Sequence, residues 1–165
     1  GTGYELKVAN SILPEWPYSA YDTSPESLEY ASDLLALFGC PTVGLRTEAF
    51  PLETPELPAE HRERYGKIVL CELLEHLEDP AAPLRSMRAA LHPQGLVFAT
   101  MAINIAQEDH VFLYRCREDA REQVVRAGFT ILREFVTPAT VIPFAEKNRD
   151  RIFTKGNYVC FLGVG

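Results

Sequence analysis

The sequence lacks any apolar run near the roughly 20 residues that a membrane-spanning helix needs, and no signal peptide opens it. Basic residues are also few, since 16 Lys and Arg against 23 Asp and Glu give a formal net charge of −7. A nucleic-acid-binding surface needs a basic face to displace counterions. We therefore expect no membrane and no nucleic acid among its partners.

Cysteine is equally scarce. The four cysteines, Cys40, Cys71, Cys116 and Cys160, are far apart, and none stands in a CxxC pair. Such a pattern is typical of reduced, mostly buried thiols in a cytoplasmic protein, rather than of disulfides or metal ligands.

What is present fits one globular domain. The 165 residues, 47% of them hydrophobic and 24% charged, can bury a core as a single domain over 1–165. The chain opens on Gly1-Thr2-Gly3, a tight turn of the kind that normally follows a strand. We therefore expect a longer natural chain, from which a first strand is missing here.

Apolar spacing and turn residues predict alternating helices and strands. In the first predicted helix Tyr4, Val8 and Ile12 lie on one apolar face. In the second, Ser24 is the expected N-cap and Gly39 the stop, and the expected buried positions are Leu28, Ala31, Leu34, Leu35 and Phe38. Helices are predicted over 4–13, 25–38, 80–91 and 118–127, strands over 18–21, 42–45, 67–71, 96–100, 130–136 and 158–164, and loop with a short helix over 101–116.

This alternation predicts an α/β fold, a doubly wound and mostly parallel sheet. The last two strands lack a clear helix between them, so one of them is expected to run antiparallel. The charged segment 144–157 between them is expected to be a lid, an acceptor-specific insertion or a solvated helix.

Four segments carry a family resemblance. Gly1-Thr2-Gly3 resembles the last three positions of a GxGxG loop, and 18–25 resembles a second-strand motif whose acid binds ribose. Residues 71–80 (CELLEHLEDP) resemble the stretch after strand four, and 91–95 an LxPGG turn with Gln94 in place of the first glycine. In this order they resemble class I S-adenosylmethionine-dependent methyltransferases, particularly the small-molecule group that includes ubiquinone-pathway O-methyltransferases.

The resemblance covers nearly the whole chain and implies a Rossmann-like sheet, here without its first central strand, with S-adenosylmethionine as cofactor. Gly1, Thr2 and Gly3 would let the cofactor approach the backbone, because glycine has no Cβ. Asp22, with Thr23, would bind the ribose at the carboxyl end of a strand. The alternative role for Asp22 is to cap the following helix.

Further cofactor contacts follow from the same resemblance. Glu48 and Ala49 would contact the adenine, although Glu48 can equally be an ordinary exposed acid. Cys71 and Glu72 would lie beside the methionine moiety, unless Cys71 is simply a small core residue. His76 recurs in the motif, but a helix histidine is often a packing group.

A nicotinamide dehydrogenase is the rival within the same fold. Its loop has the form GxGxxG, in which the third glycine allows tight packing of helix on strand. Position 6 should then be glycine, and it is Leu6. The sequence therefore disfavours this rival.

Residues after 100 should carry the acceptor site. His110, beside acids, is the candidate general base, with Asn104, Gln107 and Tyr114 as candidate substrate contacts. The alternatives are a backbone-bonded loop histidine for His110 and core packing for Tyr114. No metal is expected, because the histidines are dispersed along the sequence and none is paired at ligand spacing.

These observations predict a methyltransferase (EC 2.1.1.-) that transfers a methyl group from S-adenosylmethionine to an oxygen or nitrogen atom of a small-molecule metabolite. The competing hypothesis is a non-catalytic methyltransferase-like subunit or fragment that scaffolds a partner. The oligomeric state does not follow from the sequence.

Overall fold

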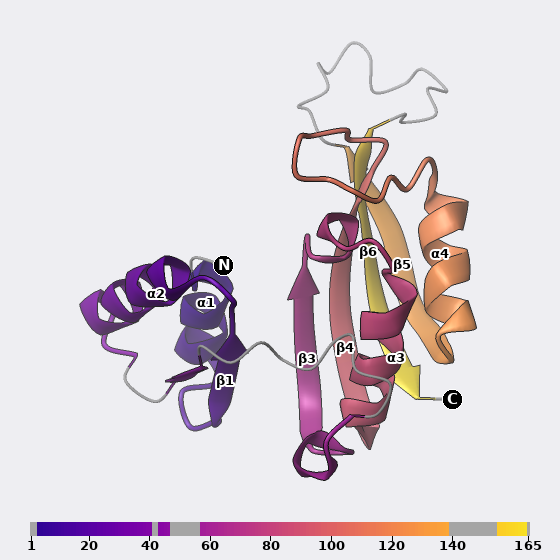
Figure 1. Ribbon diagram of the computed structural model, residues 1–165. Helices are drawn as coiled ribbons and strands as arrows, with labels where there is room; N and C mark the ends of the chain where they lie inside the picture. Colours follow the sequence, from indigo (N-terminus) through magenta and orange to yellow (C-terminus); the bar gives the residue numbers. More distant parts are fainter. Residues whose placement is uncertain (1–2, 41–42, 47–56, 139–154, 165) are drawn as a thin grey trace. The chain divides into compact units, whose positions relative to one another are not determined.

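The structure is a computed structural model that describes residues 3–40, 43–46, 57–138 and 155–164. It divides into two compact units, Gly1–Phe50 and Pro51–Gly165, each with its own strands and helices (Figure 1). The predicted lid or helix at 144–157 falls largely outside the described residues. No described helix is long and apolar enough to cross a membrane.

The first unit alternates helix and strand as predicted. It consists of helices α1 (Tyr4–Ile12) and α2 (Pro25–Leu37) with strands β1 (Tyr18–Tyr21) and β2 (Val43–Arg46). The strands pair in parallel, with Tyr18 opposite Val43 and Tyr21 opposite Arg46.

Helix α2 begins and ends where its sequence signals predict. The Ser24 hydroxyl accepts a hydrogen bond from the Ser27 N–H at 3.1 Å, which caps the helix. Gly39, at φ +65°, adopts the left-handed conformation that follows its end. Leu28, Ala31 and Leu35 are buried as predicted, but the prediction for Phe38 is wrong, since 52% of it is exposed.

Helix α1 packs on a different face from its apolar one. The exposed fractions of Tyr4 and Ile12 are 59% and 69%, whereas Gly3 and Asn10 are buried. The physical reason is the size of Gly3: a Cβ there would lie 2.8 Å from the Ala31 Cβ of α2. The two helices therefore approach each other closely at the small residues Gly3 and Ala31. The apolar side chains of Tyr4 and Ile12 take no part in this contact and are exposed.

The second unit is built on a four-stranded mixed sheet in the order β3-β4-β6-β5 (Figure 1). Strands β3 and β4 are parallel, and β6 runs antiparallel to both of its neighbours, which confirms the expectation of an antiparallel last strand. The bounds are β3 Tyr65–Cys71, β4 Leu91–Ile103, β5 Phe129–Pro138 and β6 Gly156–Val164.

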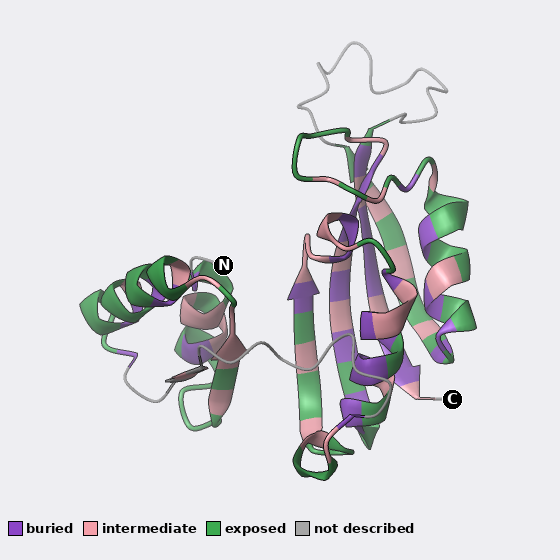
Figure 2. Cartoon of the chain, viewed as in Figure 1, coloured by how far each residue is buried: buried purple, intermediate pink, exposed green. Residues whose placement is uncertain are grey.

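Helices α3 (Ala81–Ala90) and α4 (Arg117–Arg126) lie against one face of this sheet (Figure 1). Alternate residues of β4, namely Val97, Ala99 and Met101, point into the core and are fully buried. The purple segments of Figure 2 trace this core along β4, β6 and the inner sides of both helices.

Strand β4 is longer than predicted. It begins at Leu91, and the segment 93–95, predicted as a turn before the strand, lies inside it as an irregularity: Tyr65 pairs with Leu91, but Lys67 pairs with Leu96. It then continues to Ile103, and the described residues 104–116 contain no helix, so the short helix predicted there is wrong. Short 3-10 helices occur instead at η1 (Ala59–His61) and η2 (Leu74–His76).

Candidate cofactor and acceptor sites

In the first unit, Asp22 directly follows β1. Its Oδ1 accepts a hydrogen bond from the Ser24 N–H at 2.9 Å. The capping alternative is thus present in part: Asp22 shapes the turn into α2, while Ser24 provides the side-chain cap. A carboxylate offers about four lone-pair sites, so the bond to Ser24 leaves room for further hydrogen-bond donors.

Gly3 and Asp22 lie toward the same end of this unit. The Tyr18 hydroxyl at the start of β1 is 3.0 Å from the carbonyl oxygens of Ala9 and Leu13, at the end of α1. The helix therefore runs back along the strand, and its first residues lie toward the end at which Asp22 follows β1 (Figure 1). Thr23 is exposed beside them. Of the other predicted cofactor residues, Gly1, Thr2, Glu48 and Ala49 lie outside the described residues.

In the second unit, Cys71 and Glu72 lie where β3 ends, as predicted. Cys71 is half-buried, and Glu72 has a left-handed φ of +46°, which is costly for a residue with a Cβ. Thr100 of β4 stabilises this turn. Its hydroxyl donates to Glu72 Oε1 at 2.6 Å and accepts from the Glu72 N–H at 3.2 Å.

Glu75 is a feature that the sequence reasoning missed. Only 1% of it is exposed; Oε1 accepts from the Ala102 N–H at 3.3 Å, and Oε2 has no hydrogen-bond partner among the described residues. Burial raises the pKa of its carboxyl group, and the charge of nearby Glu72 adds to this effect. The available signal was an acid enclosed by leucines in Leu73-Leu74-Glu75-His76-Leu77.

His76 and His110 are far apart in sequence but meet in space. Their ring centroids are 5.0 Å apart, with the rings nearly perpendicular. His76 Nδ1 is 2.8 Å from the Asp109 carbonyl oxygen, and His110 Nδ1 is 2.7 Å from that of Ile105. A carbonyl oxygen only accepts, so each Nδ1 carries the hydrogen and each Nε2 of the neutral ring keeps its lone pair.

The sequence argued against a metal because its histidines are dispersed along the chain. The fold removes that argument, since it brings two of them together. Glu75, His76 and His110 each offer a ligand atom, and these atoms lie within 4.8 Å of one another. Two imidazoles and a carboxylate form a donor set that can hold a divalent metal ion.

The remaining predicted acceptor residues divide into two groups. Asn104 is left-handed at φ +52°, with its N–H bonded to the Tyr114 carbonyl oxygen at 2.7 Å, and Gln107 is exposed. Tyr114, in contrast, is fully buried, and its hydroxyl hydrogen-bonds to Gln123. The alternative in which Tyr114 packs in the core is therefore the observed one.

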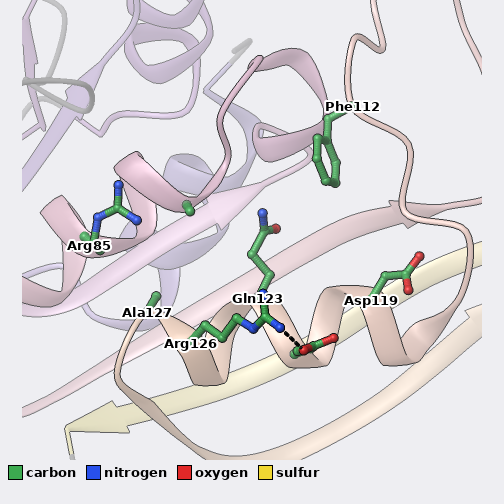
Figure 3. Close-up of a pocket in the computed structure, with 8 residues that line it drawn as sticks. Arg85, Phe112, Asp119, Gln123, Arg126 and Ala127 are labelled. Atoms are coloured by element: carbon green, nitrogen blue, oxygen red, sulfur yellow. Dashed lines mark hydrogen bonds and ion pairs between the residues drawn. The ribbon is translucent and has the colours of Figure 1, made fainter.

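A cavity of ≈ 410 Å³ lies between α3 and α4 (Figure 3). Its charged side chains are already engaged: Arg126 pairs with Glu122, and Arg85 lies 3.7 Å from Asp79. None of the predicted site residues lines it, so it is separate from the candidate sites. The lining residues are Ala81, Arg85, Phe112, Asp119, Glu122, Gln123, Arg126 and Ala127.

Parallel strands followed by helices, with acids at the strand ends, define a Rossmann-like α/β protein. A family model described as a methyltransferase domain matches residues 1–133. The chain therefore belongs to the methyltransferase domain family, and its cofactor is S-adenosylmethionine. No curated protein sequence matches the chain.

Solved structures share the fold at low identity. The [4+2]-cyclase SpnF is 14% identical with a TM-score of 0.72, covering 100% of this chain and 72% of its own. A SAM-dependent methyltransferase from Aquifex aeolicus is 14% identical with a TM-score of 0.67, covering 98% and 77%. A variant of LepI, determined in complex with SAH and a substrate analogue, is 12% identical with a TM-score of 0.67, covering 100% and 41%.

Proposed function

We propose that this methyltransferase acts on an oxygen or nitrogen atom of a small-molecule metabolite. The match of the methyltransferase family model to residues 1–133 is the observation that carries the methyl transfer. The small acceptor is supported by the net charge of −7, which disfavours a polyanionic substrate. Bound S-adenosylmethionine supplies an electrophilic methyl group on a sulfonium.

Asp22 is the proposed ribose ligand. It follows a parallel strand at the carboxyl end, where α/β sheets bind ligands, and its bond to the Ser24 N–H orients the carboxylate. Gly1, Thr2 and Gly3, with Thr23, would complete the contacts to the nucleoside, and Glu48 and Ala49 would contact the adenine. Cys71, Glu72 and His76 remain the proposed contacts to the rest of the cofactor.

At the acceptor, positioning contributes more than proton transfer. Holding two reactants in line can lower a barrier by roughly 7–11 kcal/mol, whereas a general base typically adds about 10²–10⁴-fold. His110 is the proposed base, because its Nδ1–H is held by the Ile105 carbonyl oxygen and its Nε2 can accept a proton. Asn104 and Gln107 are the proposed acceptor contacts.

We also propose that a further strand extends the sheet of the second unit. Strand β3 is the edge of the order β3-β4-β6-β5, so no other described strand bonds to its outer side. Its apolar run at 67–71 is typical of a strand buried on both faces of a parallel sheet, and such a strand is usually not left at an unprotected edge. A parallel first strand is the element that the resemblance implies at this position.

Calorimetric titration of the full-length protein with S-adenosylmethionine is the first test, since a scaffold without a cofactor site would show no binding at millimolar concentration. The second test mixes enzyme, cofactor and a panel of small hydroxyl and amine compounds, and measures S-adenosylhomocysteine. Release of this product only with an acceptor supports methyl transfer. Binding without turnover across the panel would favour a cofactor-binding protein that does not transfer methyl groups.

A further inference from the structure

The cluster Glu75-His76-His110 contains the least satisfied buried polar group in the described part of the chain. Glu75 Oε2 is buried and has no hydrogen-bond partner there. A buried carboxylate oxygen without a partner is costly, and such groups normally take up a proton, bind a cation or pair with a base. The neighbours of this oxygen therefore decide which of these three outcomes applies.

The two histidines beside it are already set in the tautomer that a cation needs. Both Nδ1 atoms donate to backbone carbonyl oxygens, His76 to Asp109 and His110 to Ile105. Metal-binding histidines usually donate their second ring N–H in this way, which fixes the ring and leaves the other nitrogen as ligand.

The surrounding charge favours a cation as well. The Glu72 carboxylate lies near that of Glu75, and Asp109 Oδ2 lies 3.5 Å from His76 Nδ1. The backbone also holds the three ligands in place, because the Phe112 N–H donates to the Glu75 carbonyl oxygen at 2.9 Å. That bond joins η2 to the loop that carries His110.

We infer that Glu75, His76 and His110 bind one divalent transition-metal ion, with Zn²⁺ as the best match. Zn²⁺ takes imidazole nitrogen and carboxylate oxygen at about 2.0–2.2 Å. The ligand atoms lie within 4.8 Å of one another, so small side-chain adjustments bring all three onto one ion. Three protein ligands leave a fourth position for water or a hydroxyl group.

This site uses the lone pair that the proposed function assigns to His110 as a base. A histidine cannot hold a cation and accept a proton on the same nitrogen, so the two roles exclude each other at any one moment. Cation binding does not depend on methyl transfer, and a binding measurement therefore tests it separately.

The test uses full-length protein freed of metal with a chelator and titrated with Co²⁺, whose visible absorption reports its coordination, and with Zn²⁺ by calorimetry. The wild type should bind one equivalent of each and show a Co²⁺ spectrum with nitrogen ligands. His110→Ala and Glu75→Gln should each weaken binding by at least the roughly 10–100-fold that loss of a supporting group costs. His92→Ala, at an exposed histidine of the same unit, is the matched control and should bind like wild type.

The metal-free unfolding midpoint of each variant is measured first. Should His110→Ala fail to fold, Glu75→Gln still decides the question, because its amide oxygen can keep the bond to the Ala102 N–H. The inference is overturned if the wild type binds neither ion at millimolar concentration. It is also overturned if the cluster variants bind as tightly as wild type, or if His92→Ala abolishes binding.

Discussion

The two units of this protein differ in how they are held together. The second has strands of 7 to 13 residues and one continuous core under α3 and α4. The described residues of the first form two strands of 4 residues each, and the buried apolar side chains among them are Leu28, Ala31, Leu35 and Cys40. Burial of apolar area stabilises the second unit, whereas the first depends on a few local contacts and the turn that carries Asp22.

Loss of core volume should have the largest effect. Leu84 of α3 is fully buried in the second unit, and 79% of Leu37 in α2 is exposed. Leu84→Ala should lower the free energy of unfolding by about 2–5 kcal/mol, because it removes apolar burial and leaves a cavity. Leu37→Ala should change it by less than about 0.5 kcal/mol. Urea unfolding measures the free energy of both variants. Equal losses would show that burial of Leu84 does not stabilise the second unit as described.

Gly3→Ala should be nearly as costly, but for a reason specific to the first unit. The new Cβ would lie 2.8 Å from the Ala31 Cβ, in a left-handed backbone with φ +78°. We expect a loss of about 2–4 kcal/mol from backbone strain and overpacking together. Gly39→Ala is the control, because it has similar strain at φ +65° and no atom within 4 Å. If the two variants lose the same stability, the contact with α2 contributes nothing.

The pH dependence of stability should depend on Glu134 in the second unit. Burial alone would raise its pKa, but hydrogen bonds from Tyr158 at 2.5 Å and Arg117 at 2.6 Å outweigh this and lower it. A lowered pKa stabilises the fold above the carboxyl group's ordinary pKa, and this stability is lost as the pH falls through the lowered value.

Glu134→Gln should therefore reduce stability by about 1–2 kcal/mol at neutral pH and flatten its decline in acid. Urea midpoints over a pH series measure this. Glu122→Gln is the control, because Glu122 forms an exposed pair with Arg126 that should contribute little. If the stability of Glu134→Gln falls with decreasing pH as steeply as that of the wild type, the hydrogen bonds from Tyr158 and Arg117 do not lower the pKa of Glu134 as described.

The smallest expected effect is the cap of α2. Ser24→Ala removes the acceptor for the Ser27 N–H and should cost about 1 kcal/mol. Ser19→Ala, at an exposed position of β1, should be close to neutral. Thermal unfolding of both variants measures the difference, and no difference between them would mean that the cap is dispensable.

Local signals in the sequence predicted much of the fold. The apolar run at 67–71, the cap at Ser24 and the stop at Gly39 all mark real elements or ends, and Gly39 has the positive φ that such an end requires. Local signals failed only between β3 and α4, where the turn predicted at 93–95 lies inside β4 and the short helix predicted over 101–116 is absent.

The other failures concern contacts between distant residues. The spacing of Tyr4, Val8 and Ile12 could not show that α1 packs through Gly3, because the close partner, Ala31, lies in another helix. The pairing of His76 with His110 was equally invisible, since α3 and β4 separate them in the chain and their meeting depends on where the loop after β4 turns back. Residue type predicted the chemistry of these side chains, but not which of them meet.

The most direct test of the account is cofactor affinity in an Asp22→Asn variant of the full-length protein, which keeps an oxygen for the Ser24 N–H but loses the carboxylate charge. Asp33→Asn, exposed on α2, is the control. Loss of hydrogen bonds to a charged group costs about 1.5–3 kcal/mol, so calorimetry should show S-adenosylmethionine binding weakened about 10- to 100-fold by Asp22→Asn and unchanged by Asp33→Asn. Equal affinity in wild type and Asp22→Asn would contradict the assignment of the ribose to the end of β1.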